Sequence, residues 1–302
     1  MNNLSSMSIK GFPALHEKLE PSLRETCPRG NHQLRFAACL IAMLCVNVGG
    51  CGPDRSGQYV PPAKPAGGAE EGPTIEKFSV WRPFFFTAYG NHAVDEIVGT
   101  AFAIRTPKAD QTYLLTAHHL LGPKTGLSQV IKPQTADQWV NRIIVSEAFG
   151  ASDSPFDAGM PINALSDDAT EDAGDERTIL LLAAGPVGSR LKPFSFSDAK
   201  VAVGDEVFLV TAVFTGESPS KRTHRAIVKA VHDDGTFECM FDNEKLGLDG
   251  ADGAPLIDAE GRVIGMNLEP LIRSSGVESR GILSTVILKE IEQRLVSAKS
   301  RP

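Results

Sequence analysis

The chain contains a six-residue run, Gly250 to Pro255, in which two glycines and a proline surround one acidic residue, Asp252. Glycine and proline are the residues that define tight turns, so this run predicts a loop of fixed conformation that presents Asp252. Two short apolar segments follow, residues 255–258 and 263–267, with a glycine-containing turn between them. A strand, a turn and a second strand directly after a glycine-rich loop indicate β-structure for this part of the chain.

Short β-prone segments separated by turn residues recur along the rest of the chain. They occupy residues 77–87, 96–104, 111–121, 140–147, 178–183, 204–211, 223–231, 235–242 and 281–287. Segment 111–121 is expected to pass from a strand into a short helical turn, and residues 223–242 are expected to form a hairpin. The acidic stretch 150–176 is expected to be a surface loop. Residues 288–298 place apolar side chains at 288, 291, 295 and 296, which predicts an amphipathic C-terminal helix. The pattern favours an all-β barrel architecture that ends in one helix.

The first 74 residues differ in composition from this β-rich part. Arg35 precedes an apolar stretch, residues 36–50, which is shorter than the roughly 20 residues needed to span a bilayer and is typical of a secretory signal. The stretch leads into Val-Gly-Gly-Cys at residues 48–51, which resembles a bacterial lipobox, so Cys51 is the predicted lipidation site. A plain signal peptide or an uncleaved anchor is the alternative. Residues 1–35 exceed a normal n-region, so we expect the natural start at Met7 or further downstream.

These differences in composition divide the chain into three parts. Residues 1–50 are expected to be an export signal. Residues 51–74 are rich in proline and glycine and nearly free of large apolar side chains, which predicts a disordered tether. Residues 75–302 are expected to form one folded domain. The expected location is the cell envelope, outside the cytoplasm, where a lipid on Cys51 would hold the chain to a membrane.

Charge and cysteine content restrict the partners of the folded part. The chain has a formal net charge of −7, and residues 1–50 contribute five basic and three acidic side chains, so the remainder carries −9. An acidic domain is not suited to bind along the phosphate backbone of a nucleic acid, so we expect no nucleic-acid partner. Four of the five cysteines lie in the first 51 residues, and Cys239 alone lies beyond them, so we expect no internal disulfide in the domain.

Four segments, taken in order, resemble motifs of trypsin-like serine peptidases, especially their bacterial HtrA-like branch. Residues 99–102 are similar to the family's Gly-Ser-Gly-Phe strand, and residues 115–119 to its Thr-Ala-x-His segment. Residues 203–208 are similar to its Val-Gly-Asp-x-Val turn, and residues 248–267 to its nucleophile loop and the strands after it. The resemblance covers about residues 80–297. It implies an all-β fold of two packed six-stranded antiparallel β-barrels with a C-terminal helix.

The same resemblance assigns roles to individual residues. His119 takes the place of the catalytic base, and Asp252 stands where the family has its nucleophilic serine. The backbone N–H groups of Gly250 and Asp252 take the oxyanion position. The residue that orients the histidine falls on Thr178, or on Asp175 if the preceding loop slips by three residues; Asp172 is more remote. That both aspartates are ordinary acidic loop residues is an equal alternative.

An aspartate at the nucleophile position changes the expected chemistry. A carboxylate cannot form the acyl-enzyme through an alkoxide, and it puts negative charge beside a pocket that stabilises an anion. Asp252 is expected within reach of His119, where the two would form a locked, inert pair. A divalent metal held by His118, His119 and Asp252 is not expected, because adjacent histidines on a short turn rarely converge on one ion. We also expect no cofactor.

Two functions are compatible with this pattern. The first is a non-catalytic pseudoprotease that binds a peptide or protein, with residues 266–268 as the strand edge that pairs with an extended peptide. The alternative is an active serine-type endopeptidase-like hydrolase of the cell envelope, which uses His119 with an atypical nucleophile. Leu246, six residues before Asp252, matches the base of the family's specificity pocket, although simple packing explains it equally well.

Overall fold

Everything described below belongs to Pro65–Pro302, the second of two units into which the chain divides. The structure is a computed structural model, and it describes residues 72–92, 98–106, 109–149, 155–164, 177–211, 223–273 and 276–300. The predicted export signal, the lipidation site Cys51 and the tether up to residue 71 lie outside these residues. Asp172 and Asp175, the candidate orienting carboxylates, lie outside them as well.

The first half of the second unit is an antiparallel sheet. Its strands pair in the order β6-β5-β1-β3-β4-β8-β7, and β2 pairs with β1. Buried aromatic and branched side chains, such as Trp81 and Phe85 on β1, explain why these segments are extended. The strands are β1 (Val80–Thr87), β2 (Gly90–Asn91), β3 (Ala101–Thr106), β4 (Ala109–Ala117), β5 (Val140–Glu147), β6 (Phe156–Asp157), β7 (Pro161–Ile162) and β8 (Ile179–Ala183).

Short helical segments connect these strands. Strand β4 runs directly into a 3-10 turn, η1 (His118–Leu121), as the sequence predicted for residues 111–121. The other segments are η2 (Pro123–Thr125), α1 (Ala136–Trp139) and η3 (Gly185–Arg190). The predicted surface loop over residues 150–176 was wrong in part, because β6 and β7 lie within it. Each is only two residues long and pairs with a longer strand, which gives too weak a periodic signal for prediction.

The second half closes into a six-stranded barrel in the order β10-β11-β14-β13-β12-β9. Closure gives every strand a partner on each side along part of its length, and the interior is filled by side chains such as Leu209, Phe237 and Leu256. The sulfur of Cys239 lies inside, 3.2 Å from the Ser279 hydroxyl. The strands are β9 (Glu206–Val210), β10 (Thr223–Val231), β11 (Thr236–Phe241), β12 (Pro255–Ile257), β13 (Val263–Arg273) and β14 (Gly276–Leu283).

The all-β class with a C-terminal helix is confirmed, and so is the predicted hairpin, which is β10 and β11. The C-terminal barrel is closed, whereas the pairings of the N-terminal sheet, over the described residues, form an open series rather than a second closed barrel. One apolar core joins the two sheets: Phe102 and Leu115 of the first belong to the same cluster as Phe208, Met266 and Leu268 of the second. The two sheets therefore pack against each other through a shared interior.

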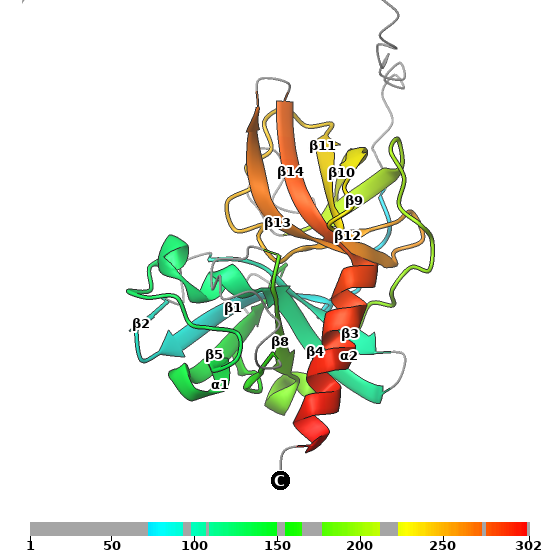
Figure 1. Ribbon diagram of the computed structural model, residues 1–302. Coiled ribbons are helices and arrows are strands. Elements are labelled where there is room, and N and C mark those ends of the chain that lie inside the picture. The colour runs from blue at the N-terminus through cyan, green and yellow to red at the C-terminus, as the bar shows by residue number, and fades with distance from the viewer. Residues whose placement is uncertain are drawn as a thin grey trace, which may run out of the picture. The chain divides into compact units, whose positions relative to one another are not determined.

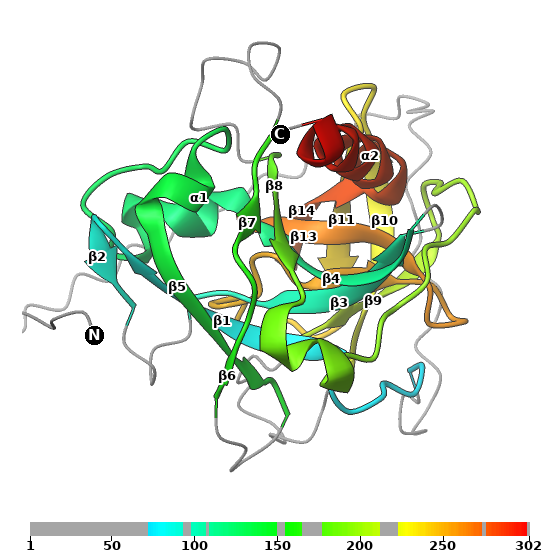
Figure 2. The ribbon, with the colours of Figure 1, turned by 90° about the horizontal axis from the view of Figure 1, so that it is seen from below.

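The C-terminal helix α2 (Ser284–Ser300) leads from the barrel onto the first sheet and contacts β13, β14, β7 and β8 (Figures 1 and 2). It buries Ile287, Ile291 and Arg294, which recur at helical spacing. The predicted apolar face was wrong at position 296, since Val296 is 70% exposed. Arg294 replaces it on the buried face because its guanidinium donates hydrogen bonds to the carbonyls of Ile162 and Ile179, at 2.8 and 2.7 Å.

No helix in the described ranges is long and apolar enough to cross a membrane.

Candidate active site

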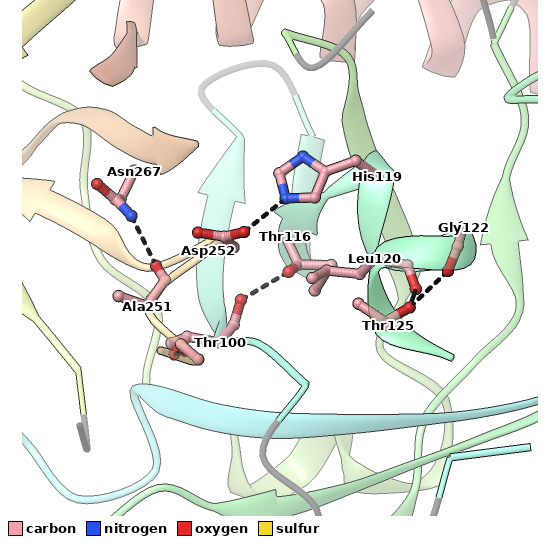
Figure 3. Close-up of polar contacts among 10 residues, drawn as sticks. Thr100, Thr116, His119, Leu120, Gly122, Thr125, Ala251, Asp252 and Asn267 are labelled. Carbon is pink, nitrogen blue, oxygen red and sulfur yellow. Dashed lines mark hydrogen bonds and ion pairs between the residues drawn. The ribbon is translucent and has the colours of Figure 1, made fainter. Parts of the chain in front are cut away.

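The loop that carries Asp252 is held against the first sheet by hydrogen bonds to its carbonyl groups. The backbone N–H of Thr100 donates to the Asp252 carbonyl at 2.8 Å, and the Thr100 hydroxyl donates to the Gly250 carbonyl at 2.7 Å. On the barrel side, the Asn267 amide donates to the Ala251 carbonyl at 3.1 Å (Figure 3). Three consecutive carbonyls thus have fixed directions, and the Asp252 side chain between them has a fixed position.

Gly253 permits this close approach of loop and sheet. Its φ of +82° lies in the left-handed region, which residues other than glycine rarely adopt. A Cβ at this position would lie 2.2 Å from the Thr116 hydroxyl and 2.4 Å from the Thr100 carbonyl. The Thr116 hydroxyl itself donates to the Thr100 carbonyl at 2.6 Å, so the space is already filled. The fixed loop that the sequence predicted therefore depends on glycine at 253.

The structure brings His119 and Asp252 together. His119 lies on η1, and its Nε2 is 2.9 Å from Oδ2 of Asp252 (Figure 3). The two side chains are 11% and 25% exposed, so the pair lies at the edge of solvent. The other ring nitrogen of His119, Nδ1, is buried and has no hydrogen-bond partner among the residues described. The histidine therefore has one nitrogen paired with a carboxylate and the other enclosed.

Thr178 does not act on the His119 ring in this structure. Its backbone carbonyl accepts a hydrogen bond from the backbone N–H of His118 at 2.9 Å, which fixes the start of η1 to the start of β8. No hydrogen bond within the described ranges joins the Thr178 side chain to His119. Thr178 thus supports the backbone of the histidine turn.

The His118 side chain is buried and is hydrogen-bonded to the segment that carries Ile131. Its Nε2 lies 2.7 Å from the carbonyl oxygen of Ile131, which can only accept, so Nε2 carries the proton. Burial lowers the pKa of His118 to about 4, and the positive charge of Arg294 and the neighbouring His119 act in the same direction. No cluster of three potential metal-binding side chains occurs in the described part of the chain.

A small pocket opens beside the His119–Asp252 pair. Its volume is about 240 Å³, and its lining includes His119, Asp252, Asp249, Lys124, Leu248 and Pro270. Gly250 also lines it, and in the described part of the chain the backbone N–H groups of Gly250 and Asp252 have no acceptor. Leu246 is buried in the core of the barrel, in agreement with a packing role.

The unpaired edge of β13 at this pocket begins at Leu268, whereas the sequence predicted an edge over residues 266–268. Met266 pairs with Pro255 of β12, and the backbone of Asn267 is bonded to Gly253 and Ala254, with both N···O distances 2.8 Å. This side of β13 is therefore already occupied up to Asn267. Over the described residues, the strand continues from Leu268 to Arg273 with β14 as its partner on one side.

A family model for the trypsin-like peptidase domain matches residues 99–266, which is more than half of the chain. The chain therefore belongs to the trypsin-like peptidase family. The match begins at Gly99, before the Thr100 anchor, and ends within β13, so it spans both the histidine turn and the Asp252 loop.

Solved structures that are similar to this chain include proteases. The active form of the Rv3671c protease from M. tuberculosis is 16% identical, with a TM-score of 0.45, and the match covers 72% of this chain and 80% of that one. The serine endoprotease from Yersinia pestis is 16% identical, with a TM-score of 0.46, over 73% of this chain and 64% of that one. The HtrA-type protease AlgW with a decapeptide is 16% identical, with a TM-score of 0.46, over 72% and 65%. No curated protein sequence matches the chain significantly.

Replacing Gly253 by alanine is expected to displace the loop. The matched control is Gly204→Ala, because Gly204 also has a positive φ, of +94°, but open space where its Cβ would lie. Gly204→Ala loses only the free energy of holding a residue with a side chain at positive φ, about 1–3 kcal/mol. Gly253→Ala adds overpacking, which costs roughly a further 1–3 kcal/mol. Urea unfolding of the two variants measures the difference. Equal losses in the free energy of unfolding would contradict the close contact at Gly253.

Proposed function

We propose that this chain is an exported, lipid-anchored member of the trypsin-like peptidase family that binds a peptide or protein without cleaving it. One observation carries the proposal: the Asp252 carboxylate lies 2.9 Å from His119, on the loop whose sequence is similar to the family's nucleophile loop. In this interpretation Asp252 replaces the serine, and the turn that presents it is retained.

The histidine in this arrangement is unsuited to act as a general base. A general base needs a ring nitrogen within hydrogen-bond reach of the proton that it removes. In His119, Nε2 faces the Asp252 carboxylate and Nδ1 is buried. The two threonine hydroxyls beside the loop, on Thr100 and Thr116, both donate to backbone carbonyls. Loss of the nucleophile of a triad costs about 10⁶-fold in rate in a comparable protease.

The exposed edge of β13 supports a role in peptide binding. An extended peptide can add to a strand whose outer edge is unpaired, and side-chain pockets along the edge then give specificity. The edge from Leu268 to Arg273 starts beside the pocket, and Pro270 is part of the pocket lining. Proline has no N–H, so a peptide at this point would bond through its own donors to carbonyl oxygens of β13. Ile272, further along the edge, is fully exposed.

Export and anchoring are supported by the sequence. A basic residue, an apolar stretch, small residues and Cys51 follow one another directly, and a proline- and glycine-rich stretch then leads to the folded domain. A lipid on Cys51 would retain the domain at the membrane surface, and the stretch after it would set how far the peptide-binding edge reaches.

Asp252→Ser tests whether the missing hydroxyl is what prevents catalysis. Full-length protein is incubated with a fluorophosphonate probe, which reacts with activated serines. We expect no labelling of the wild type or of Asp252→Ala, and labelling of Asp252→Ser. The rate depends on the orienting carboxylate, for which Asp175 is a candidate outside the described residues, because a triad without it loses about 10⁴-fold in rate. Labelling of the wild type, or hydrolysis of casein by it, would instead establish the active serine-type hydrolase with an atypical nucleophile.

Peptide binding is tested at Ile272, with Val203 as the control, since both are exposed residues of the C-terminal half. Fluorescein-labelled denatured casein is titrated with full-length protein and followed by anisotropy. We expect saturable binding by the wild type. Ile272→Asp should weaken the affinity about 5-fold or more, which corresponds to the loss of about 1 kcal/mol of binding free energy. Val203→Asp should bind as the wild type does. No saturable binding, or equal losses in both variants, would refute the β13 edge as the peptide site.

Lipid attachment is tested at Cys51, with Cys45 as the control within the same segment. The full-length chain is expressed in bacteria in the presence of radiolabelled palmitate. We expect label in the wild type and in Cys45→Ser, and none in Cys51→Ser, because the acylated thiol is then absent. Incorporation that persists in Cys51→Ser would rule out the lipobox interpretation.

A further inference from the structure

His118, next to the site histidine, is a buried titratable group to which the peptide-binding proposal gives no role. Its side chain is buried against the segment that carries Ile131, and its backbone N–H donates to the carbonyl of Thr178, the residue before β8. Nε2 donates to the Ile131 carbonyl at 2.7 Å, and Nδ1 is buried without a partner among the described residues. The neutral ring therefore has its donor paired, whereas a second proton, on Nδ1, would have no acceptor among the residues that the structure describes.

Burial and nearby groups disfavour a positive charge on His118, whereas its hydrogen bond to the Ile131 carbonyl favours one. Among the described residues, the charged or titratable groups that act on the ring are Arg294 of α2 and its own neighbour His119. Arg294 is fully buried, pairs with Glu290 on the same helix, and donates to the carbonyl of Ile179, the residue after Thr178. A proton on His118 would thus add a second cation beside a buried guanidinium.

We propose that His118 makes the site acid-sensitive: a proton on its Nδ1 releases the turn η1 from β8 and separates His119 from Asp252. The turn is the element suited to move, because it is one 3-10 turn of four residues whose backbone is bonded to β8 through the Thr178 carbonyl. The Asp252 loop stays, because Thr100 and Asn267 hold its carbonyls independently of the turn.

The pH range follows from the direction of the shift. Burial lowers the pKa of His118 from 6.5 to about 4 in the closed structure, while a released, solvated ring titrates near its ordinary value. Between these values His118 binds more protons in the open state than in the closed state, so its titration destabilises the closed state as the pH falls from about 6.5 to about 4. The ratio of open to closed molecules should rise about 20-fold between pH 7 and pH 5.

Hydrogen exchange of single amides tests the proposal on the full-length chain. By NMR, the amide of His118, which donates to Thr178, should lose about 20-fold in protection between pH 7 and pH 5 after correction for the intrinsic rate. The amide of Thr100, which donates to Asp252, should keep its protection. In His118→Gln, which keeps a donor for Ile131 but does not titrate, both amides should be insensitive to pH. His232→Gln, an exposed histidine of the barrel, should behave as the wild type.

A second measurement follows Asp252 itself. Carbodiimide coupling of glycine ethyl ester at pH 5, read by mass spectrometry, should modify Asp252 several-fold faster in the wild type than in His118→Gln, with exposed Asp157 as the internal reference. His118→Phe replaces the glutamine variant if that does not fold. Equal rates at Asp252, an unchanged His118 amide, or loss of protection in His118 and Thr100 together would overturn the proposal. Neither measurement depends on peptide binding or catalysis.

Discussion

The two hydrogen bonds that Thr100 donates to the loop carbonyls are the contacts on which the site depends. They join the residue before β3 of one sheet to a loop of the other. Backbone groups at such a junction must be paired, because an unpaired buried carbonyl costs about 1–3 kcal/mol. Thr100, Thr116 and Asn267 supply these partners, so the direction of the Asp252 side chain is set by backbone bonding on both sides of it.

Sequence reasoning predicted the parts of this arrangement that follow from local pattern. The glycine-rich loop, the passage from strand into the histidine turn and the hairpin were all predictable, because turn residues and alternating apolar residues define them. The contact between His119 and Asp252 was predicted from the resemblance to a family. The hydrogen bond from the Asn267 side-chain amide to the Ala251 carbonyl was not predicted, and neither was the exact start of the free edge of β13. Both depend on which carbonyls of the loop remain unpaired in three dimensions.

Arg294 shows the same limit on the C-terminal helix. From the sequence, an arginine in an amphipathic helix is expected to face solvent. Arg294 is nevertheless among the largest fully buried side chains of the described residues. The carbonyls of Ile162 and Ile179 make burial favourable, and these lie on strands more than 100 residues away in sequence. Long-range polar partners of this kind leave no trace in a periodic pattern, so the predicted apolar face differed from the observed one.

The chemistry of Cys239, which is enclosed in the barrel, bears on the cellular compartments in which the fold can form. Burial raises the pKa of the Cys239 thiol to about 11, so at neutral pH it carries almost no thiolate, the form that attacks oxidants and disulfides. The barrel around it is closed by strand pairing, with no contribution from a sulfur cross-link. The same fold should therefore form in a reducing and in an oxidising compartment, and transport between the two would need no redox step to complete it.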